Sequence, residues 1–241
     1  MLYYETFSVQ PMLQFNQLHT AIARLPGDLA RRILRVADQQ EQAQRAAAYV
    51  LLERMMKKCT VQFREELQAV ENADFAVFYD QNSPLSALHY DAYGKPYFAG
   101  CENASLSISH AGSMVGCALV LEEDGKTASP VGIDVQNVDL DRKRAERIAS
   151  RYFSDGENLL LAPHAADDEA FCHLFTRIWT RKEAYLKYRG VGMSEISTAD
   201  TTNHALPCAF AEAEQTVTVP LANGKTCEEL YYITLCYDRA D

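Results

Sequence analysis

The sequence predicts an α+β protein built as two similar halves. Each half has one long stretch with helical spacing, at about residues 39–58 and 169–189, and several short runs rich in β-formers. Helices and strands follow one another in irregular order, which favours an α+β architecture over a strictly alternating parallel sheet. A charged stretch bounded by glycine and proline, residues 122–130, divides the chain nearly in half. We therefore expect two domains, residues 1–125 and residues 126–241.

The first half contains the clearest amphipathic helix. Ala43, Ala47, Leu51 and Met55 recur at helical spacing between about residues 39 and 58. The other elements expected here are a helix at about 61–70, a strand at 75–79, a loop at 81–86, a turn at 93–97, and two strands at 106–110 and 115–121 joined by a tight loop.

The second half begins with an apolar strand and contains the longest helix. Gly190 stands where a helix C-terminal cap belongs, directly after that helix. The expected elements are a strand at 131–138, helices at 140–152 and 169–189, and strands at 214–219 and 230–237.

Composition excludes several classes of protein. The 241 residues are 48% hydrophobic and 23% charged, as in an ordinary globular protein, and no apolar run approaches a membrane span. The net charge of −10 argues against nucleic-acid binding, which needs clustered lysine and arginine. Seven cysteines without a C-x-x-C pair, and an N-terminus without a basic cluster, indicate a cytoplasmic protein without zinc or disulfides.

Two short motifs stand out. In Gly132-Ile133-Asp134 a carboxylate interrupts an apolar strand, and burial of a carboxylate is costly unless it meets a cation. In the run from Trp179 to Lys187, Glu183 and Lys187 lie one helical turn apart and point the same way. Each motif alone has an ordinary interpretation, a strand-end aspartate or a surface ion pair. Together, two carboxylates and a lysine would hold Mg²⁺ against a pyrophosphate.

The combination G-I-D … W-x-x-K-E-A-x-x-K resembles the signature of the Sfp-type 4′-phosphopantetheinyl transferases. Such enzymes move the phosphopantetheine arm of coenzyme A onto a serine of a carrier protein and release adenosine 3′,5′-bisphosphate, the reaction of a holo-[acyl-carrier-protein] synthase. The resemblance implies a pseudodimer of two α+β halves, each a small antiparallel sheet packed with a long helix. It places the active site in the cleft between them.

The resemblance also implies roles for particular residues. The Mg²⁺ ligands would be Asp134 and Glu183, and the catalytic residues Glu183, as the base, and Lys187. Segments that resemble the family's S-x-S-H and G-K-P motifs precede the G-I-D motif. The implied coenzyme A contacts are Arg45, Lys95, Ser109, His110 and Lys187, with Arg31 and Arg32 as looser candidates for the 3′-phosphate. Ala46 stands where some members carry a hydroxyl residue.

One position departs from the commonest form of the signature. Many members read G-I-D-x-E, and here the last position is Gln136. An amide oxygen binds Mg²⁺ without adding charge, and Mg²⁺ readily keeps waters instead. We therefore expect a site with two carboxylates and a water in place of the third.

The expected partners are coenzyme A and an acyl or peptidyl carrier protein, served by a monomer without nucleic acid or membrane. Basic residues at 142–151 are either a solvated helix face or a docking face for an acidic carrier protein. Two other functions remain open, a non-catalytic module that binds coenzyme A or a carrier protein, and a different Mg²⁺ phosphotransferase or hydrolase. The second lacks support because neither a Walker A loop nor a kinase motif set is present.

Overall fold

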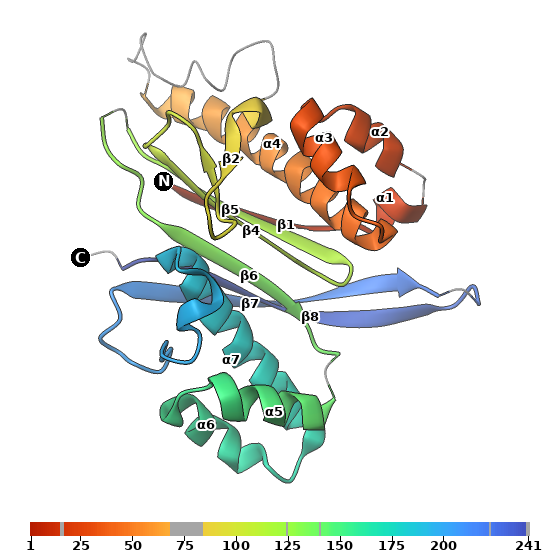
Figure 1. The fold of residues 1–241 in the computed structure, drawn as a ribbon, viewed down its shortest axis with the longest axis vertical. Coiled ribbons are helices and arrows are strands. Elements are labelled where there is room, and N and C mark those ends of the chain that lie inside the picture. Colours follow the sequence, from red (N-terminus) through yellow and green to blue (C-terminus); the bar gives the residue numbers. More distant parts are fainter. Residues whose placement is uncertain (15–16, 68–83, 124, 140, 222, 240–241) are drawn as a thin grey trace.

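A computed structural model describes residues 1–14, 17–67, 84–123, 125–139, 141–221 and 223–239. The expected α+β class with small antiparallel sheets is confirmed (Figure 1). Elements of the first half are β1 (Leu2–Ser8), α1 (Gln10–Gln14), α2 (Leu18–Ala23), α3 (Gly27–Leu34), α4 (Gln39–Leu67), η2 (Pro84–Ala87), β2 (Leu88–Tyr90), β3 (Pro96–Phe98), β4 (Ala104–Ala111) and β5 (Met114–Leu121). Elements of the second half are β6 (Val131–Asn137), α5 (Arg142–Tyr152), α6 (Asp155–Leu161), η3 (Ala162–His164), α7 (Asp168–Arg189), η4 (Gly192–Glu195), β7 (Cys208–Pro220) and β8 (Thr226–Asp238).

The first half is a three-stranded antiparallel sheet in the order β1-β5-β4, with a separate β2-β3 ribbon. Strand β5 is buried along its whole length because both of its faces are covered. Cys117 and Leu119 pack in the core that includes α4, whereas Ala118 and Val120 pack against residues of β6 and β8. The strand at the centre of this sheet therefore joins the two cores.

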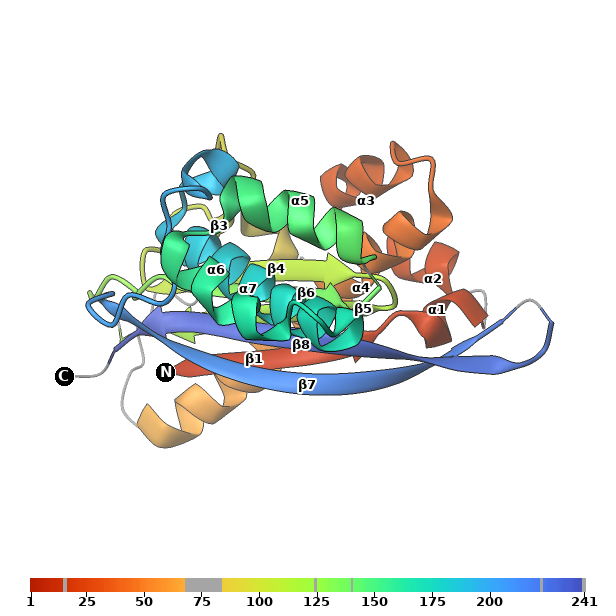
Figure 2. The same cartoon turned by 90° about the horizontal axis from the view of Figure 1, so that it is seen from below.

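The second half is a three-stranded antiparallel sheet in the order β6-β8-β7, with α7 packed on β6 and β8. Strands β7 and β8 continue well past the body of the protein as a long twisted ribbon (Figure 2). Helix α5 begins with Asp141 as its N-cap, whose side chain accepts from Arg144 N, and α7 ends at Gly190 with a φ of 69°. The expected C-terminal cap of the long helix is therefore confirmed.

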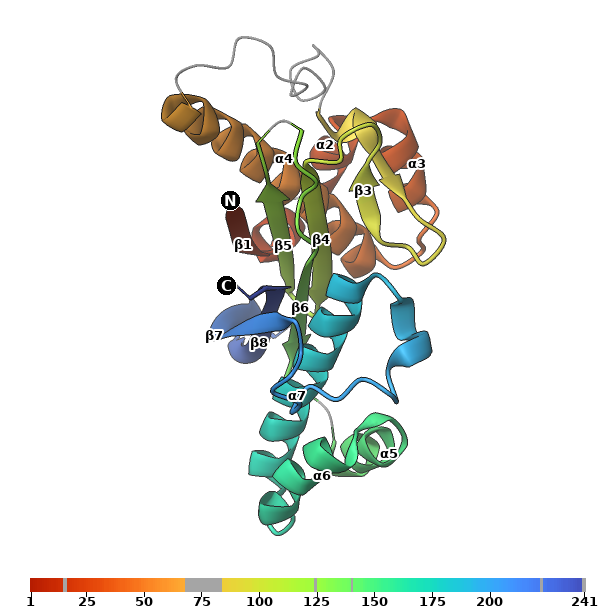
Figure 3. The same ribbon diagram turned by 90° about the vertical axis from the view of Figure 1, so that its left-hand side faces the viewer.

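The two halves meet where β4 runs beside β6 (Figures 1 and 3). The contact is made by side chains of β4: Ser107 Oγ accepts from Ile133 N at 3.0 Å, and Ser109 Oγ accepts from Val135 N at 3.2 Å. The alternating serines thus satisfy backbone donors on the edge of β6 that is not paired with β8. Without them, those buried N–H groups would have no acceptor in place of a neighbouring strand.

Several expected elements need correction. The separate helix expected at 61–70 is wrong as far as residue 67, because α4 continues unbroken from Gln39 to Leu67 with neither glycine nor proline in it. Residues 68–70 lie outside the described residues. Of the loop expected at 81–86, residues 81–83 lie outside the described residues, and the rest is wrong because Pro84 opens a short 3₁₀ helix. The strand expected at 75–79 lies outside the described residues. Elements that the sequence did not reveal are β1, the short helices α1 to α3, α6, residues 208–213 of β7 and residues 226–229 of β8.

Gly132 sets the distance between β6 and α7. A Cβ atom at this position would lie 2.0 Å from Ala184 O and 2.5 Å from Tyr188 N, both backbone atoms of α7. Backbone cannot rotate away as a flexible side chain can, so the helix would have to lift off the strand.

We expect Gly132→Ala to lower the free energy of unfolding by about 3 kcal/mol, since overpacking of a rigid contact has this order of cost. Denaturant unfolding measures it. The control is Gly27→Ala, where the new Cβ would meet only a side-chain atom at 3.5 Å. Equal stability of the two variants would contradict the close packing of α7 on β6.

Candidate active site

Asp134 lies in the middle of β6 and is fully buried. Its Oδ1 accepts from Ser109 Oγ at 2.7 Å and from Lys187 Nζ at 2.6 Å, and its Oδ2 accepts from Gln136 Nε2 at 3.1 Å. Three donors from β4, α7 and β6 therefore surround one carboxylate. The hydrogen bonds and the ion pair compensate for burial of the charge, as the sequence requires.

Helix α7 brings the second carboxylate to the same place. The pKa of Glu183 is raised to about 8, first by burial and then by the negative charge of Asp134, with which its side chain also forms a hydrogen bond. Lys187 and a hydrogen bond with Trp179 act in the opposite direction. Two carboxyl groups this close favour one shared proton or one added cation. The pair therefore has the chemistry of a cation site.

Trp179 completes this face of α7, as its spacing predicts. Its ring stacks with those of Phe153 and Phe175 at centroid distances of 6.4 and 6.2 Å. The aromatic stack holds the indole of Trp179 in place, and the indole N–H donates a hydrogen bond to Glu183. Trp179 is thus part of the wall behind the carboxylates.

The two carboxylates and their neighbours fit a hard divalent cation. Among the described parts of the chain, His, Cys, Asp and Glu form no cluster of three or more that could hold a metal. Asp134 and Glu183 supply two carboxylate groups, and Gln136 lies beside Asp134 with its amide. Such an oxygen set suits Mg²⁺, which takes one or two carboxylates and completes its shell with water and phosphate oxygens.

A cationic cavity of about 200 Å³ lies near this cluster, because His110 in its wall is close enough to Lys187 and Asp134 for their charges to shift its pKa. Arg32, Arg45 and His110 line it together with Tyr49 and Tyr90. The Arg32 guanidinium lies 3.8 Å from the centroid of the Tyr90 ring, which holds it in place. Three potential cations in one cavity of an acidic protein make a local anion site.

Only some of the basic residues predicted in the first half line the cationic cavity. Arg45 forms an ion pair with Glu41 at 2.6 Å while lining the cavity. Arg31 instead pairs with the exposed Asp28 and is not among the lining residues. Of the two looser candidates, the structure therefore places Arg32 at the cavity.

His110 is solvent-exposed, yet it lies among cations at the end of β4. Partial desolvation lowers the pKa of its imidazole, and the positive charges of Lys187 and Arg45 lower it further. A lowered pKa favours the neutral imidazole, which can still donate a hydrogen bond.

A second cavity, of about 270 Å³, is lined by Glu183 and Lys187 and adjoins the first, with which it shares Gly94, Pro96 and Ile108. Its walls are largely apolar and include Ile108, Leu186 and Met193. Tyr93 and the glycines at 94, 190 and 192 also line it. Met193 could not be found from the sequence, since the segment after Gly190 shows neither periodicity nor a motif.

Lys95 reaches α7 rather than open space. Its Nζ donates to Lys187 O at 2.6 Å and to Tyr188 O at 3.3 Å, and burial lowers the pKa of its ammonium. These carbonyls belong to the last turn of the helix, where a cation is favoured. Lys95 therefore ties the β2–β3 turn to the helix that carries Glu183 and Lys187, while its stem lines the second cavity.

Comparison with known proteins confirms the resemblance seen in the sequence. Residues 130–230, which contain Asp134, Glu183 and Lys187, match the family model of the 4′-phosphopantetheinyl transferase superfamily. The chain is 35% identical over 125 residues to the 4′-phosphopantetheinyl transferase AcpT of Escherichia coli K12, covering 51% of this chain and 58% of the relative. It is 35% identical over 132 residues to AcpT of Salmonella typhi, covering 55% and 62%. It is 31% identical over 102 residues to the 4′-phosphopantetheinyl transferase Sfp of Bacillus subtilis 168, covering 42% and 40%. The chain thus spans less than two thirds of the length of these relatives.

Among the described residues, no helix has both the length and the apolar character needed to cross a membrane.

Ser109 offers a direct test of the join between the halves. Ser109→Ala removes a donor to Asp134 and an acceptor of Val135 N and Lys187 Nζ. We expect the free energy of unfolding to fall by about 2 kcal/mol, the usual cost of buried polar groups left without partners. Urea unfolding measures this loss, with Ser105→Ala on the same strand as the control. A loss no larger than that of Ser105→Ala would show that Ser109 does not stabilise the join.

Proposed function

We propose that this chain is an Sfp-type 4′-phosphopantetheinyl transferase. It moves the phosphopantetheine arm of coenzyme A onto a serine of a carrier protein, depends on Mg²⁺, and releases adenosine 3′,5′-bisphosphate. In this proposal it acts as a monomeric holo-[acyl-carrier-protein] synthase, and the halves 1–125 and 126–241 form a pseudodimer with the substrate in the cleft between them. One observation carries the proposal: Asp134, Glu183 and Lys187 form one cluster, and two of them, Glu183 and Lys187, line a cavity that adjoins the cationic one.

The chemistry of the cavities supports this substrate. Coenzyme A has a highly charged nucleotide end and an uncharged arm. The cavity with Arg32, Arg45 and His110 suits the nucleotide and its 3′-phosphate. The apolar cavity beside Glu183 and Lys187 suits the pantetheine arm. The pyrophosphate that joins the two parts would then lie at the carboxylate–lysine cluster.

Asp134 and Glu183 would hold Mg²⁺, which neutralises charge on the pyrophosphate oxygens when bound. Lys187 stabilises the same oxygens, and Ser109 and Gln136 keep Asp134 in its orientation. The serine oxygen of the carrier protein forms a bond to the β-phosphorus, and the bond from that phosphorus to the bridging oxygen breaks. Glu183 accepts the serine proton, and adenosine 3′,5′-bisphosphate leaves with the bridging oxygen.

The carrier protein would dock on α5. Arg142 is half-buried: its guanidinium lies 3.6 Å from the centroid of the Phe171 ring and pairs with Glu146 and Asp168, so it is not counted in the docking face. Lys143, Arg144 and Arg147 are exposed on the same helix. They would give the acidic protein a local basic surface for an acidic partner.

The test of function is transfer itself. An apo carrier protein is incubated with this protein, coenzyme A and Mg²⁺, and the mass gain of one phosphopantetheine group is followed. We expect Asp134→Asn and Glu183→Gln each to lower the rate by about 10²-fold or more, as for loss of a central electrostatic contact. The control is Glu228→Gln, which removes an exposed carboxylate from the β8 ribbon.

Retention of full rate by either folded variant would contradict the site assignment. Absence of any mass gain with the unmodified protein, together with binding of coenzyme A, would favour a non-catalytic binding module.

Gln136 allows the two-carboxylate model to be tested separately. We expect Gln136→Glu to reach half-maximal rate at a lower Mg²⁺ concentration, because affinity rises with ligand charge. Gln136→Ala should keep substantial activity, since Asp134 retains its contacts with Ser109 and Lys187. A Mg²⁺ titration of the transfer rate compares the three proteins. An inactive but folded Gln136→Ala would show that the amide binds the metal or substrate directly.

A further inference from the structure

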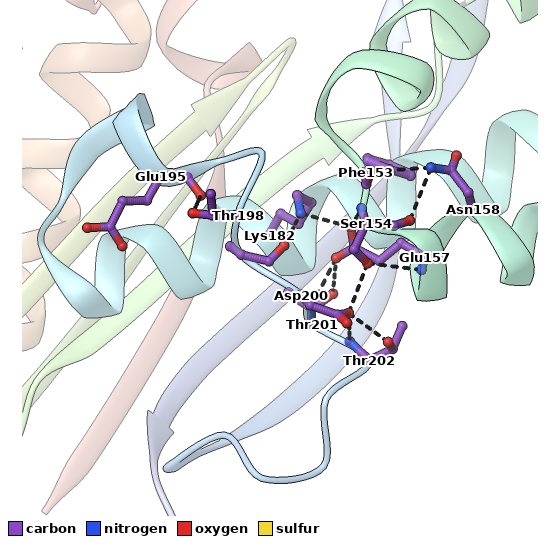
Figure 4. A network of polar contacts seen from close by, with 11 residues as sticks. Phe153, Ser154, Glu157, Asn158, Lys182, Glu195, Thr198, Asp200, Thr201 and Thr202 are labelled. Atoms are coloured by element: carbon purple, nitrogen blue, oxygen red, sulfur yellow. Dashed lines mark hydrogen bonds and ion pairs between the residues drawn. The ribbon is translucent and has the colours of Figure 1, made fainter.

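Lys182 has a fully buried side chain, although it precedes Glu183 in the motif. Neighbouring residues of a helix point about 100° apart, so Lys182 faces away from the carboxylate pair. Its Nζ donates to Glu157 Oε2 at 2.8 Å and to the carbonyl oxygen of Ala199 (Figure 4). The ring of Phe153 lies 5.9 Å from the ammonium.

Glu157 is equally buried and has both carboxylate oxygens engaged. Oε2 accepts from Lys182 Nζ and from Ser154 N at 2.9 Å. Oε1 accepts from Thr201 N at 3.0 Å and from Thr201 Oγ1 at 2.7 Å. The pair thus binds three segments to one another: the N-terminus of α6, the middle of α7, and the turn at 199–202 (Figure 4). Asp200 adds to this join by accepting from Ser154 Oγ at 2.9 Å.

The turn at 199–202 is connected to the wall of the apolar cavity. Ala199 N donates to Glu195 O at 3.0 Å, and Ile196 N donates to Met193 O at 3.3 Å. Gly192 and Met193 line that cavity beside Glu183 and Lys187. The segment after α7 is therefore held at one end by the Gly190 cap and at the other by Lys182.

Stability alone is a weak reason for such a pair. Buried ion pairs are commonly replaced by apolar residues of similar volume without loss of stability, because desolvation offsets the attraction between the charges. The ammonium, however, selects one carboxylate and one carbonyl by geometry. An apolar pair would fill the same space without fixing where Ala199 lies.

We propose that Lys182 and Glu157 are positioning residues, which set the Gly192–Met193 wall against the pantetheine arm of coenzyme A. The proposal rests on the proposed function, and it assigns the pantetheine arm to a wall that the nucleotide end of coenzyme A does not contact. Adenosine 3′,5′-bisphosphate lacks the arm and would occupy only the cationic cavity. A shifted wall therefore weakens binding of coenzyme A and leaves binding of the bisphosphate unchanged.

Calorimetric titration with the two ligands tests this. We expect the double variant Lys182→Met/Glu157→Gln to bind coenzyme A about tenfold more weakly than the unmodified protein. Its affinity for adenosine 3′,5′-bisphosphate should stay within about twofold, because only coenzyme A contacts the displaced wall. The control is Lys126→Met, which removes an exposed lysine from the linker. Equal losses for the two ligands, or no loss for either, would overturn the proposal.

A second variant tests the proposal even if the buried double variant does not fold. Met193 is 52% exposed, so Met193→Ala changes the wall with little effect on the core. We expect the same selective loss for coenzyme A, and wild-type binding of both ligands by Met193→Ala would overturn the proposal. Failure of the unmodified protein to bind coenzyme A, with the fold intact, would instead overturn the proposed function on which the inference rests.

Discussion

The buried carboxylate of Asp134 is the constraint on which the rest of the site depends. A carboxylate in an apolar strand requires compensating charge and hydrogen bonds, and here these come from Lys187, Ser109 and Gln136. Two of the donors lie outside the strand, on α7 and on β4 of the other half. Satisfying one buried charge therefore fixes how the long helix and both sheets meet.

Close packing makes that arrangement possible. Gly132, two residues before Asp134 on the same face of β6, lets the backbone of α7 approach the strand. Ser107 and Ser109 bring β4 to the edge of β6 through side-chain oxygens. Small and short polar residues therefore occupy the positions where elements must come near, and the charged groups occupy the space that remains between them.

Adjacent residues of α7 have different environments. Burial, and then the negative charge of Asp134, raise the pKa of Glu183 to about 8, whereas Lys182 meets a single buried carboxylate whose two oxygens are both engaged. An acid pair short of positive charge suits a site that receives a cation. The Lys182–Glu157 pair, in which every polar group has a partner, suits a structural contact that holds segments in place. Lys95 has a similar structural contact, since its ammonium lies on the last carbonyls of the helix.

The sequence by itself determined the α+β class, the long helices and the paired carboxylates, because strand alternation and helical spacing place Asp134, Glu183 and Lys187 on definite faces. It also identified Gly190 as a cap, since a left-handed backbone favours glycine. Only the tertiary structure decided that Arg32 rather than Arg31 lines the cationic cavity, that Lys95 reaches α7, and that Lys182 pairs with Glu157. Each of these contacts depends on how segments far apart in the sequence pack against one another. Local periodicity shows which face a side chain occupies, but not which partner a long side chain reaches on another segment.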